Sequence, residues 1–247
     1  MKDKQPAIKL VFEKVSHSYG AVSVLEDLNL EVKAGEVVVL VGPSGCGKTT
    51  ILNLLSGHIQ PVSGSVTREG TVRTVYQQDG LFPWLTVSEN VAIGLRSMKD
   101  DVKRKHEITE LLNLVHLDGF ADHYPHQLSG GMRQRAELAR VLAGDSDILL
   151  MDEPFSALDY QARLKMRREL VRVLEKLPRT VVFVTHDIEE AAQLADRVLV
   201  LSKRPATISR VLSIQTSRPR GLADDSVVEA MRMILNELGL DNTSGGE

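Results

Sequence analysis

The sequence is poor in cysteine, in aromatic residues and in long apolar runs, and each shortage excludes a class of protein. Its 247 residues include one cysteine, Cys46, which rules out an internal disulfide and a four-cysteine zinc site. Aromatic residues make up 4%, too few for a repeated base-stacking surface. No apolar run approaches the roughly 18 residues that cross a bilayer, and the first residues lack the apolar segment of a secretory signal. We therefore expect a protein that does not cross a membrane and stays in a reducing compartment, by default the cytosol.

An excess of either charge is also missing. Thirty Lys and Arg stand against 33 Asp and Glu, a net charge of -3 that provides no basic field for nucleic acid. Hydrophobic residues make up 43% and charged residues 26%, which suits one domain, or one domain with an insertion, around a sizeable core. We expect no nucleic-acid partner, and any bound anion must be held by a local group of residues.

Two kinds of apolar pattern predict strands. Apolar residues that alternate between Ile8 and Val32 are typical of two half-buried antiparallel strands joined by a turn. Continuous apolar runs are typical of strands buried on both faces of a parallel sheet, and they occur at residues 37–41, 148–151, 181–184 and 198–201. Helical patterns at 160–177 and 188–195 separate these runs, so the chain is predicted to adopt a layered α/β fold.

Helical signals occupy two further segments. Thr86 and Glu89 form a capping box, and apolar residues then recur at helical spacing, so 86–143 is predicted to be a helical insertion. A second capping box at Ser226 and Glu229, with Gly239 at the far end, predicts a terminal helix after a hydrophilic linker at 216–220. The expected divisions are a core of residues 1–85 and 144–205, a helical subdomain at 86–143, and a C-terminal strand, helix and frayed tail at 206–247.

The strongest local motif has the form G-x-x-x-x-G-K-T and lies between the strand predicted at 37–41 and a helix that starts at Thr50. Glycines let backbone N–H groups converge on phosphate oxygens, and the helix N-terminus adds positive potential. Lys48 supplies a charge for the β- and γ-phosphates, and the Thr49 hydroxyl suits Mg²⁺. The motif consists of Gly42, Pro43, Ser44, Gly45, Cys46, Gly47, Lys48 and Thr49. It predicts a site for a nucleoside triphosphate and magnesium.

Cys46 lies inside this loop, near a helix N-terminus, where the pKa of a thiol can be lowered. A small residue with no catalytic duty is the simpler interpretation.

Acidic residues and a histidine follow two other predicted strands. Asp152 and Glu153 come after the run at 148–151, and His186 follows the run at 181–184. Open parallel sheets bind ligands at the carboxyl ends of their strands. Asp152 is expected to hold Mg²⁺, Glu153 to deprotonate the attacking water, and His186 to hydrogen-bond the γ-phosphate or that water. Taken singly, each could instead be a solvated or structural strand end.

A second anion-binding helix start is predicted at Ser129, Gly130 and Gly131, where the serine can cap the helix and the glycines expose N–H groups. A single nucleotide does not obviously need two such sites, and an ordinary serine-glycine helix start is the alternative.

Together these motifs resemble the ATP-binding cassette ATPases over residues 7 to 205. The resemblance is carried, in the order typical of that family, by Tyr19, GPSGCGKTT, Gln77, LSGGMRQR, LLMDEP, SALD at 156–159, and His186. It implies a P-loop NTPase core with a layered sheet, an N-terminal antiparallel β-subdomain and an inserted α-helical subdomain. It also implies ATP and Mg²⁺ as cofactors.

The resemblance implies further roles for individual residues. Tyr19 would stack on adenine, with Val24 and Thr50 in the same nucleotide site, although Tyr19 could also be a core or turn aromatic. Gln77 would join Thr49 and Asp152 around Mg²⁺ and link the attacking water to the helical subdomain. Ser129 to Gly131 would contact the ATP bound by the opposite subunit, and Asp159 would signal across that interface. A homodimer that sandwiches two ATP molecules therefore follows.

The segment QQDGLFPWL places large apolar residues just before the helical insertion. In the family this region receives a helix of the membrane permease, so Leu81, Phe82 and Trp84 are expected to contact it, with burial in the chain's own core as the alternative. Together with residues 201–205, the segment resembles the importers of nitrate, sulfonates, taurine or bicarbonate. Such a subunit would lie peripherally on the cytoplasmic face of the inner membrane and act indirectly with a solute-binding protein. A soluble ABC-type ATPase acting on DNA or ribosomes, and a P-loop kinase of small molecules, are the alternatives.

Overall fold

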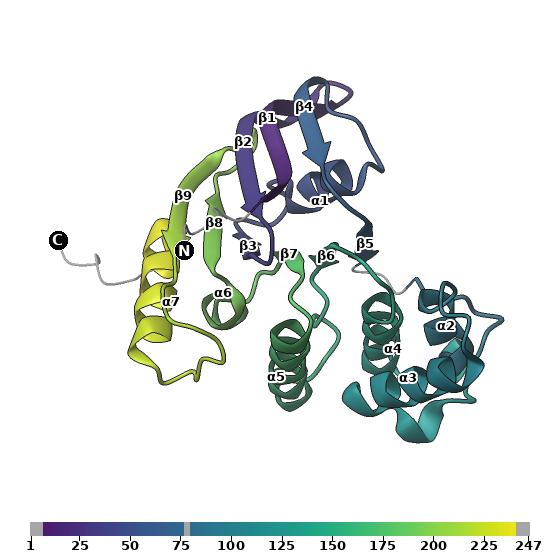
Figure 1. The fold of residues 1–247 in the computed structure, drawn as a ribbon. Helices are drawn as coiled ribbons and strands as arrows, with labels where there is room; N and C mark the ends of the chain where they lie inside the picture. The colour runs from purple at the N-terminus through teal and green to yellow at the C-terminus, as the bar shows by residue number, and fades with distance from the viewer. Residues whose placement is uncertain (1–6, 77–79, 241–247) are drawn as a thin grey trace, which may run out of the picture.

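Two sheets organise the residues that the computed structural model describes, 7–76 and 80–240 (Figure 1). The smaller sheet is antiparallel, with the strand order β2-β1-β4. The larger sheet has the order β5-β6-β7-β3-β8-β9. Its strands β5, β6, β7, β3 and β8 are parallel, and β9 runs antiparallel to β8. The strands are β1 (Ile8–Tyr19), β2 (Val22–Lys33), β3 (Val37–Val41), β4 (Ser63–Arg68), β5 (Val72–Val75), β6 (Ile148–Asp152), β7 (Thr180–Val184), β8 (Arg197–Leu201) and β9 (Ile208–Ser213).

The antiparallel sheet confirms the two strands predicted from apolar alternation. Leu10 and Phe12 on β1 are buried, whereas Val11 between them is more exposed. Strand β4 pairs with the other edge of β1 and was not predicted, because its sequence SGSVTR leaves most side chains exposed and carries no apolar alternation.

The parallel sheet contains all four strands predicted from continuous apolar runs. Every residue of β3, β6 and β7 is buried, because the sheet is covered on both faces. Alternate residues of β3 serve two cores: Val37, Val39 and Val41 pack on one side, and Val38 and Leu40 on the other. Strand β5 was not predicted, because VRTV is short and only half-buried.

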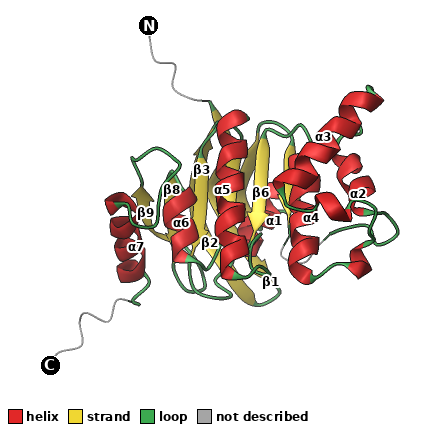
Figure 2. Cartoon of the chain, turned by 90° about the horizontal axis from the view of Figure 1, so that it is seen from below, coloured by secondary structure: helices red, strands yellow, loops and turns green. Residues whose placement is uncertain are grey.

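Helices cover the two faces of the parallel sheet. Helix α1 (Lys48–Ser56) lies between the two sheets, and α5 (Tyr160–Lys176) and α6 (Ile188–Leu194) lie on the opposite face (Figures 1 and 2). The helical patterns predicted at 160–177 and 188–195 are thereby confirmed. None of the helices within 7–76 and 80–240 is both long enough and apolar enough to cross a bilayer.

Helices alone occupy residues 86–143, all of which are described. They are α2 (Val87–Gly94), α3 (Asp101–Leu114), two short 3₁₀ turns (Asp118–Phe120 and Pro125–Gln127) and α4 (Gly130–Leu142). The predicted capping box is confirmed: the Glu89 N–H donates to Thr86 Oγ1 at 3.3 Å, and the Thr86 N–H donates to Glu89 Oε2 at 2.7 Å. The segment joins β5 to its parallel neighbour β6 and projects to one side of the sheet (Figure 1).

The capping box predicted at Ser226 and Glu229 is wrong. Helix α7 (Asp225–Glu237) begins earlier, with Asp224 at the N-cap position and no side-chain cap. The Asp224 carboxylate instead accepts a hydrogen bond from the Gly221 N–H at 2.8 Å, so it stabilises the turn before the helix. Gly239 has φ +68° just after the C-cap, as expected of a glycine that ends a helix. The tail predicted to fray, 241–247, lies outside the described residues.

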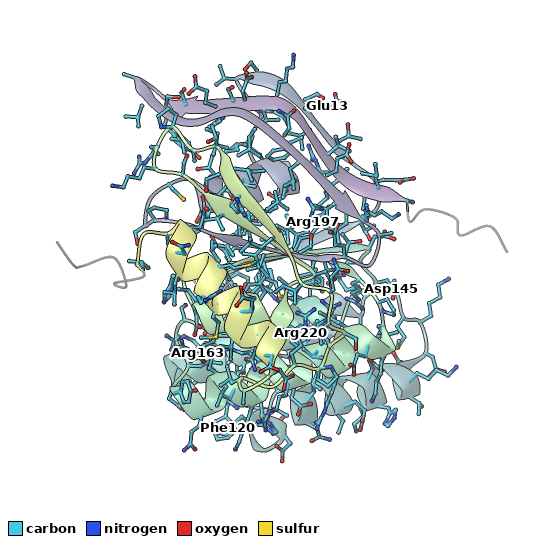
Figure 3. The ribbon with its side chains drawn as sticks, turned by 90° about the vertical axis from the view of Figure 1, so that its left-hand side faces the viewer. Glu13, Phe120, Asp145, Arg163, Arg197 and Arg220 are labelled. Carbon is cyan, nitrogen blue, oxygen red and sulfur yellow. The ribbon has the colours of Figure 1, made fainter. Side chains whose placement is uncertain are left out.

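The hydrophilic linker at 216–220 contains a buried arginine (Figure 3). The Arg220 side chain is 1% exposed, and its guanidinium donates to the carbonyls of Ala195 at 2.6 Å and of Thr216 at 2.5 Å and 2.8 Å. A guanidinium offers five N–H donors, so one side chain can satisfy several carbonyls at once. Arg220 therefore attaches the linker to the carboxyl end of α6.

Replacing Arg220 by alanine would leave these buried carbonyls without donors. We expect Arg220→Ala to lower the free energy of unfolding by about 2 to 4 kcal/mol, measured by urea denaturation. Arg210→Ala, on the exposed face of β9, is the matched control and should change stability by less than about 0.5 kcal/mol. Equal stability of the two variants would contradict an anchoring role for Arg220.

Candidate functional site

A cavity of about 580 Å³ lies where the carboxyl ends of the central parallel strands meet the antiparallel sheet. It is lined by residues from β1, β2, the loop after β3, the first turn of α1, the ends of β6 and β7, and the β8–β9 hairpin. The lining residues are Tyr19, Val24, Ser44, Gly45, Gly47, Lys48, Thr49, Thr50, Glu153, Val184, His186 and Arg204. Three of the strand ends predicted to carry chemistry therefore open onto one cavity.

The loop between β3 and α1 has the backbone that its glycines allow. Gly45 and Gly47 have φ +73° and +124°, conformations that other residues rarely adopt. A Cβ atom at Gly47 would lie 2.8 Å from Val24 Cγ1, so only glycine fits there. Helix α1 begins at Lys48 without a side-chain cap, so its first N–H groups are available to an anion. Lys48 Nζ donates to the carbonyls of Gly42 at 2.8 Å and of Pro43 at 3.0 Å, which holds the amine across the loop.

Three residues of the predicted phosphate loop do not line the cavity. Gly42 packs closely against Leu201, and the Pro43 carbonyl accepts a hydrogen bond from the Cys46 N–H at 3.2 Å. The Cys46 side chain is 2% exposed and belongs to the core between the two sheets. These three residues hold the conformation of the loop, whereas their neighbours face the cavity.

Burial raises the pKa of the Cys46 thiol, and the smaller opposing effect of the Lys48 charge does not reverse the shift. A lowered thiol pKa, which a position near a helix N-terminus allows, is therefore not found, and burial agrees with the simpler interpretation of Cys46 as a small residue of the core. The physical reason is that the thiol is buried among apolar side chains, and this desolvation outweighs the charge of Lys48 and the backbone hydrogen bonds of Lys48 and Cys46 at the helix start.

Asp152 lies at the end of β6 and is 4% exposed. Burial raises the pKa of its carboxyl, while a hydrogen bond with the Thr49 side chain and the charge of Lys48 act in the opposite direction. Thr49 and Asp152 thus bring two hard oxygen donors together beside the phosphate loop. This donor set fits a small divalent cation such as Mg²⁺.

Glu153 and His186 are neighbours across two strand ends. Glu153 Oε2 lies 3.1 Å from His186 Nδ1, and the two side chains are 19% and 62% exposed. Glu153 has φ +48°, which is unusual for a residue with a side chain, and its N–H donates to the Val184 carbonyl at 2.9 Å. Backbone strain of this kind persists where surrounding contacts enforce it, and it aims the carboxylate into the cavity.

The second serine-glycine helix start does not contribute to this cavity. Ser129 caps α4 by accepting a hydrogen bond from the Met132 N–H at 3.3 Å. Gly131 packs against the backbone of Ala157, and Asp159 caps α5 by accepting from the Ala162 N–H at 2.9 Å. Of the predicted site residues, the helix start at Ser129, Gly130 and Gly131 and the cap residue Asp159 line no part of the cavity, and neither does Asp152.

Gln134 connects the two regions and was not predicted from sequence. It is 4% exposed; its Nε2 donates to the Glu153 carbonyl at 3.1 Å, and its Oε1 accepts from the Ala157 N–H at 3.0 Å. Gln134 lies within the LSGGMRQR motif, but both of its contacts are made to backbone groups of a loop remote in sequence, so the motif alone does not show what it bonds. Gln134 holds helix α4 against the segment that carries Glu153.

Tyr19 ends β1 and is 50% exposed, so it is not a core aromatic. Its ring stands edge-on to the buried His17, with centroids 4.8 Å apart, and it lines the cavity together with Val24. Gln77, predicted to join the magnesium site, lies outside the described residues. Arg204 also lines the cavity and was not predicted as a site residue.

The residues predicted to meet a permease differ in exposure. Leu81 is 7% exposed and packs in the core, so its assignment as a contact residue is wrong. Trp84 is 68% exposed, and the half-buried Phe82 ring lies 5.5 Å from it and 5.6 Å from the Arg140 guanidinium. An exposed tryptophan supported by a neighbouring ring remains as a candidate contact.

The burial of Cys46 makes a direct prediction for thiol chemistry. We expect iodoacetamide to label Cys46 in the folded protein at pH 8 at least about 100-fold more slowly than in urea, since labelling needs both exposure and a thiolate. Mass spectrometry of timed samples measures both rates. Comparable rates in the folded and unfolded protein would show that the thiol faces solvent.

Comparison with known proteins identifies relatives along most of the chain. The sequence profile of the ABC transporter family matches residues 25–156. An uncharacterised ABC transporter ATP-binding protein of Methanocaldococcus jannaschii is 43% identical, covering 88% of this chain and 85% of the relative. The aliphatic sulfonates import ATP-binding protein SsuB of Bacillus cereus is 38% identical over 96% of this chain and 98% of its own length. The sulfate/thiosulfate import ATP-binding protein CysA of Pseudomonas aeruginosa is 46% identical over 79% of this chain and 64% of its own.

Solved structures agree with the fold. A dimeric ATP-binding cassette in a post-hydrolysis state, bound to ADP and Pi, superposes with a TM-score of 0.76 at 32% identity and covers 84% of this chain and all of that one. The predicted fold class, a P-loop NTPase with antiparallel and parallel sheets, is confirmed. With its phosphate loop, strand-end acids and serine-glycine helix start in the arrangement described above, this chain belongs to the ABC transporter family as an ATP-binding cassette ATPase.

Proposed function

We propose that this chain is the ATP-hydrolysing subunit of an ABC importer and drives a small solute through a separate membrane permease. One observation carries the proposal: the phosphate loop, Glu153 and His186 converge on one cavity, while the helix start at Ser129 lies outside it. That separation is what a shared, two-subunit ATP site requires.

ATP occupies the cavity with its base at the Tyr19 end and its phosphates at the loop. Tyr19 offers an exposed aromatic face to adenine, and Val24 supplies apolar contact beside it. The N–H groups around Gly45 and Gly47 and at the start of α1 bind phosphate oxygens, and Lys48 adds a charge. Thr50, on the first turn of α1, completes the contacts.

Mg²⁺ would be held by the Thr49 hydroxyl and by Asp152, directly or through water, with Gln77 as a third ligand. When bound, the ion neutralises charge on the phosphates during transfer. The hydrogen bond between Thr49 and the buried Asp152 supports this assignment, because the two oxygen donors are already adjacent.

Glu153 acts as the general base. Its carboxylate reaches the cavity from a fixed backbone, and it accepts the proton of the water that attacks the γ-phosphate. His186, 3.1 Å from Glu153 Oε2, orients this carboxylate and hydrogen-bonds the γ-phosphate or the water. Residues at the ends of β6 and β7 thus carry out the chemical step, and the loop after β3 binds the substrate.

Two copies of the chain pair head to tail, so that Ser129, Gly130 and Gly131 of one copy meet the γ-phosphate held by the other. Asp159, which caps α5 beside this helix start, lies on the shared surface and signals across it. The dimeric, ADP-bound relative supports this assembly. Gln134 gives the helical subdomain at 86–143 a mechanical link to Glu153, so each subunit couples its own chemistry to the helix that it lends to its partner.

The permease docks where Phe82 and Trp84 are presented beside α2 and α4. A large exposed apolar side chain is costly in water unless a partner covers it. The full-length similarity to SsuB supports an anion such as a sulfonate, nitrate, taurine or bicarbonate as cargo, received from a solute-binding protein by the permease. The subunit is then peripheral, on the cytoplasmic face of the inner membrane.

Glu153→Gln tests the catalytic assignment. The amide keeps the size of the side chain but cannot take a proton, so ATP turnover should fall by about 10² to 10⁴ while ATP binding is retained. Phosphate release measures turnover, and calorimetry measures binding. Lys48→Ala is the contrasting variant and should weaken ATP binding itself. Sedimentation of Glu153→Gln with MgATP should show a dimer; strictly monomeric protein, or wild-type turnover, would refute the mechanism.

Trp84→Ala tests the permease assignment. We expect the variant to lose at least about tenfold in co-purification with a multi-span membrane protein, since central aromatic contacts dominate interfaces. Val102→Ala, which truncates an apolar side chain that is 81% exposed on α3, is the matched control and should co-purify normally. Co-purification of the wild type with nucleic acid and no membrane protein would favour an ATPase acting on DNA or ribosomes.

A further inference from the structure

We infer that Arg204 is a second cationic side chain for the phosphates of the bound nucleotide, presented by the hairpin between β8 and β9. The inference rests on the ATP site proposed above and adds a residue to it. The hairpin is remote in sequence from the phosphate loop, and its arginine reaches the same cavity as Lys48.

Backbone contacts hold the hairpin in place. The Ala206 N–H donates to the Val24 carbonyl at 2.8 Å, and the Glu26 N–H donates to the Ala206 carbonyl at 3.2 Å. Ala206 is fully buried, so it fastens the hairpin to β2. Within the turn, the Ser202 N–H donates to the Thr207 carbonyl at 3.0 Å, and the Thr207 N–H donates to Ser202 Oγ at 3.0 Å. Arg204 therefore projects from a backbone that is fixed on both sides.

The guanidinium of Arg204 lies against the phosphate loop. A Cβ atom at Gly45 would stand only 2.8 Å from Arg204 Nη2, so the missing side chain of Gly45 leaves the space that the guanidinium takes. In the part of the chain that the structure describes, no hydrogen bond or ion pair engages this guanidinium. Its donors face the cavity without an internal acceptor.

Charge favours phosphate as the acceptor. A triphosphate carries several negative charges, and Lys48 and Arg204 are the permanently cationic side chains among the described residues that line the cavity. Lys48 Nζ already donates to two loop carbonyls, whereas Arg204 keeps all five donors for an external group. A guanidinium binds phosphate oxygens in pairs, which a lysine amine cannot do.

Position favours the phosphates over the base. Arg204 contacts the loop at Gly45, and Tyr19, the aromatic side chain that suits adenine, comes from the other sheet. The charge of Arg204 is also felt inside the loop, where it opposes the rise that burial causes in the pKa of Cys46. Arg204 thus acts on the same part of the site as Lys48.

The test compares Arg204→Gln with Lys203→Gln. Both changes remove one positive charge from the same exposed turn, but Lys203 does not line the cavity. Isothermal calorimetry with MgATP and MgADP at several salt concentrations measures affinity, and thermal unfolding checks that the variants fold. Arg204→Lys is the second variant, because it keeps the charge and loses only the paired geometry.

We expect Arg204→Gln to weaken ATP and ADP binding by about 5- to 20-fold at low salt, as for the loss of one charged hydrogen bond in a partly exposed site. The deficit should shrink as salt screens the contact, Arg204→Lys should lie between the two, and Lys203→Gln should bind like the wild type. Equal affinity of Arg204→Gln and Lys203→Gln would overturn the inference, and so would a deficit that salt leaves unchanged, which indicates a contact with the base. Failure of the wild type to bind ATP would instead refute the proposed function.

Discussion

The parallel pairing of β3, β6 and β7 is the constraint on which the rest of the structure depends. Leu40 is level with Val184, and Val184 is level with Asp152, so the residues that follow all three strands emerge at one edge. Because these strands are buried on both faces, a shift in register would move apolar residues between two different cores. The cost of that shift holds the phosphate loop, Glu153 and His186 at fixed relative positions.

Strain and hydrogen bonds at this edge connect the chemical site to the helical segment. Glu153 keeps its left-handed backbone because its N–H bonds to β7 and its carbonyl accepts from Gln134. Gln134 belongs to α4, the helix that begins at Ser129. A displacement of α4 must therefore act on the backbone of Glu153. A single buried amide is enough for this, because in a low-dielectric interior neither partner can leave its hydrogen bond without a large penalty.

Much of the fold was predictable, and the failures have particular causes. The strands at 37–41, 148–151, 181–184 and 198–201 carry apolar runs that only a sheet covered on both faces can bury. Strand β4 is held mainly by backbone pairing with β1 and exposes its side chains, so no pattern marks it. The start of α7 was misplaced because Asp224 satisfies the preceding turn rather than the helix. The exposure of Leu81 was misjudged because neighbouring helices cover it.

The sequence by itself determined the family and predicted the site residues, since a phosphate loop, a pair of acids after a buried strand and a strand-end histidine are local patterns that can be recognised from the few residues around them. Tertiary structure decided which groups meet. It turned Cys46 into the core, brought Arg204 from a distant hairpin against Gly45, and joined Gln134 to the backbone of Glu153. These contacts depend on how segments far apart in the chain pack together, and short-range patterns of polarity carry no information about that.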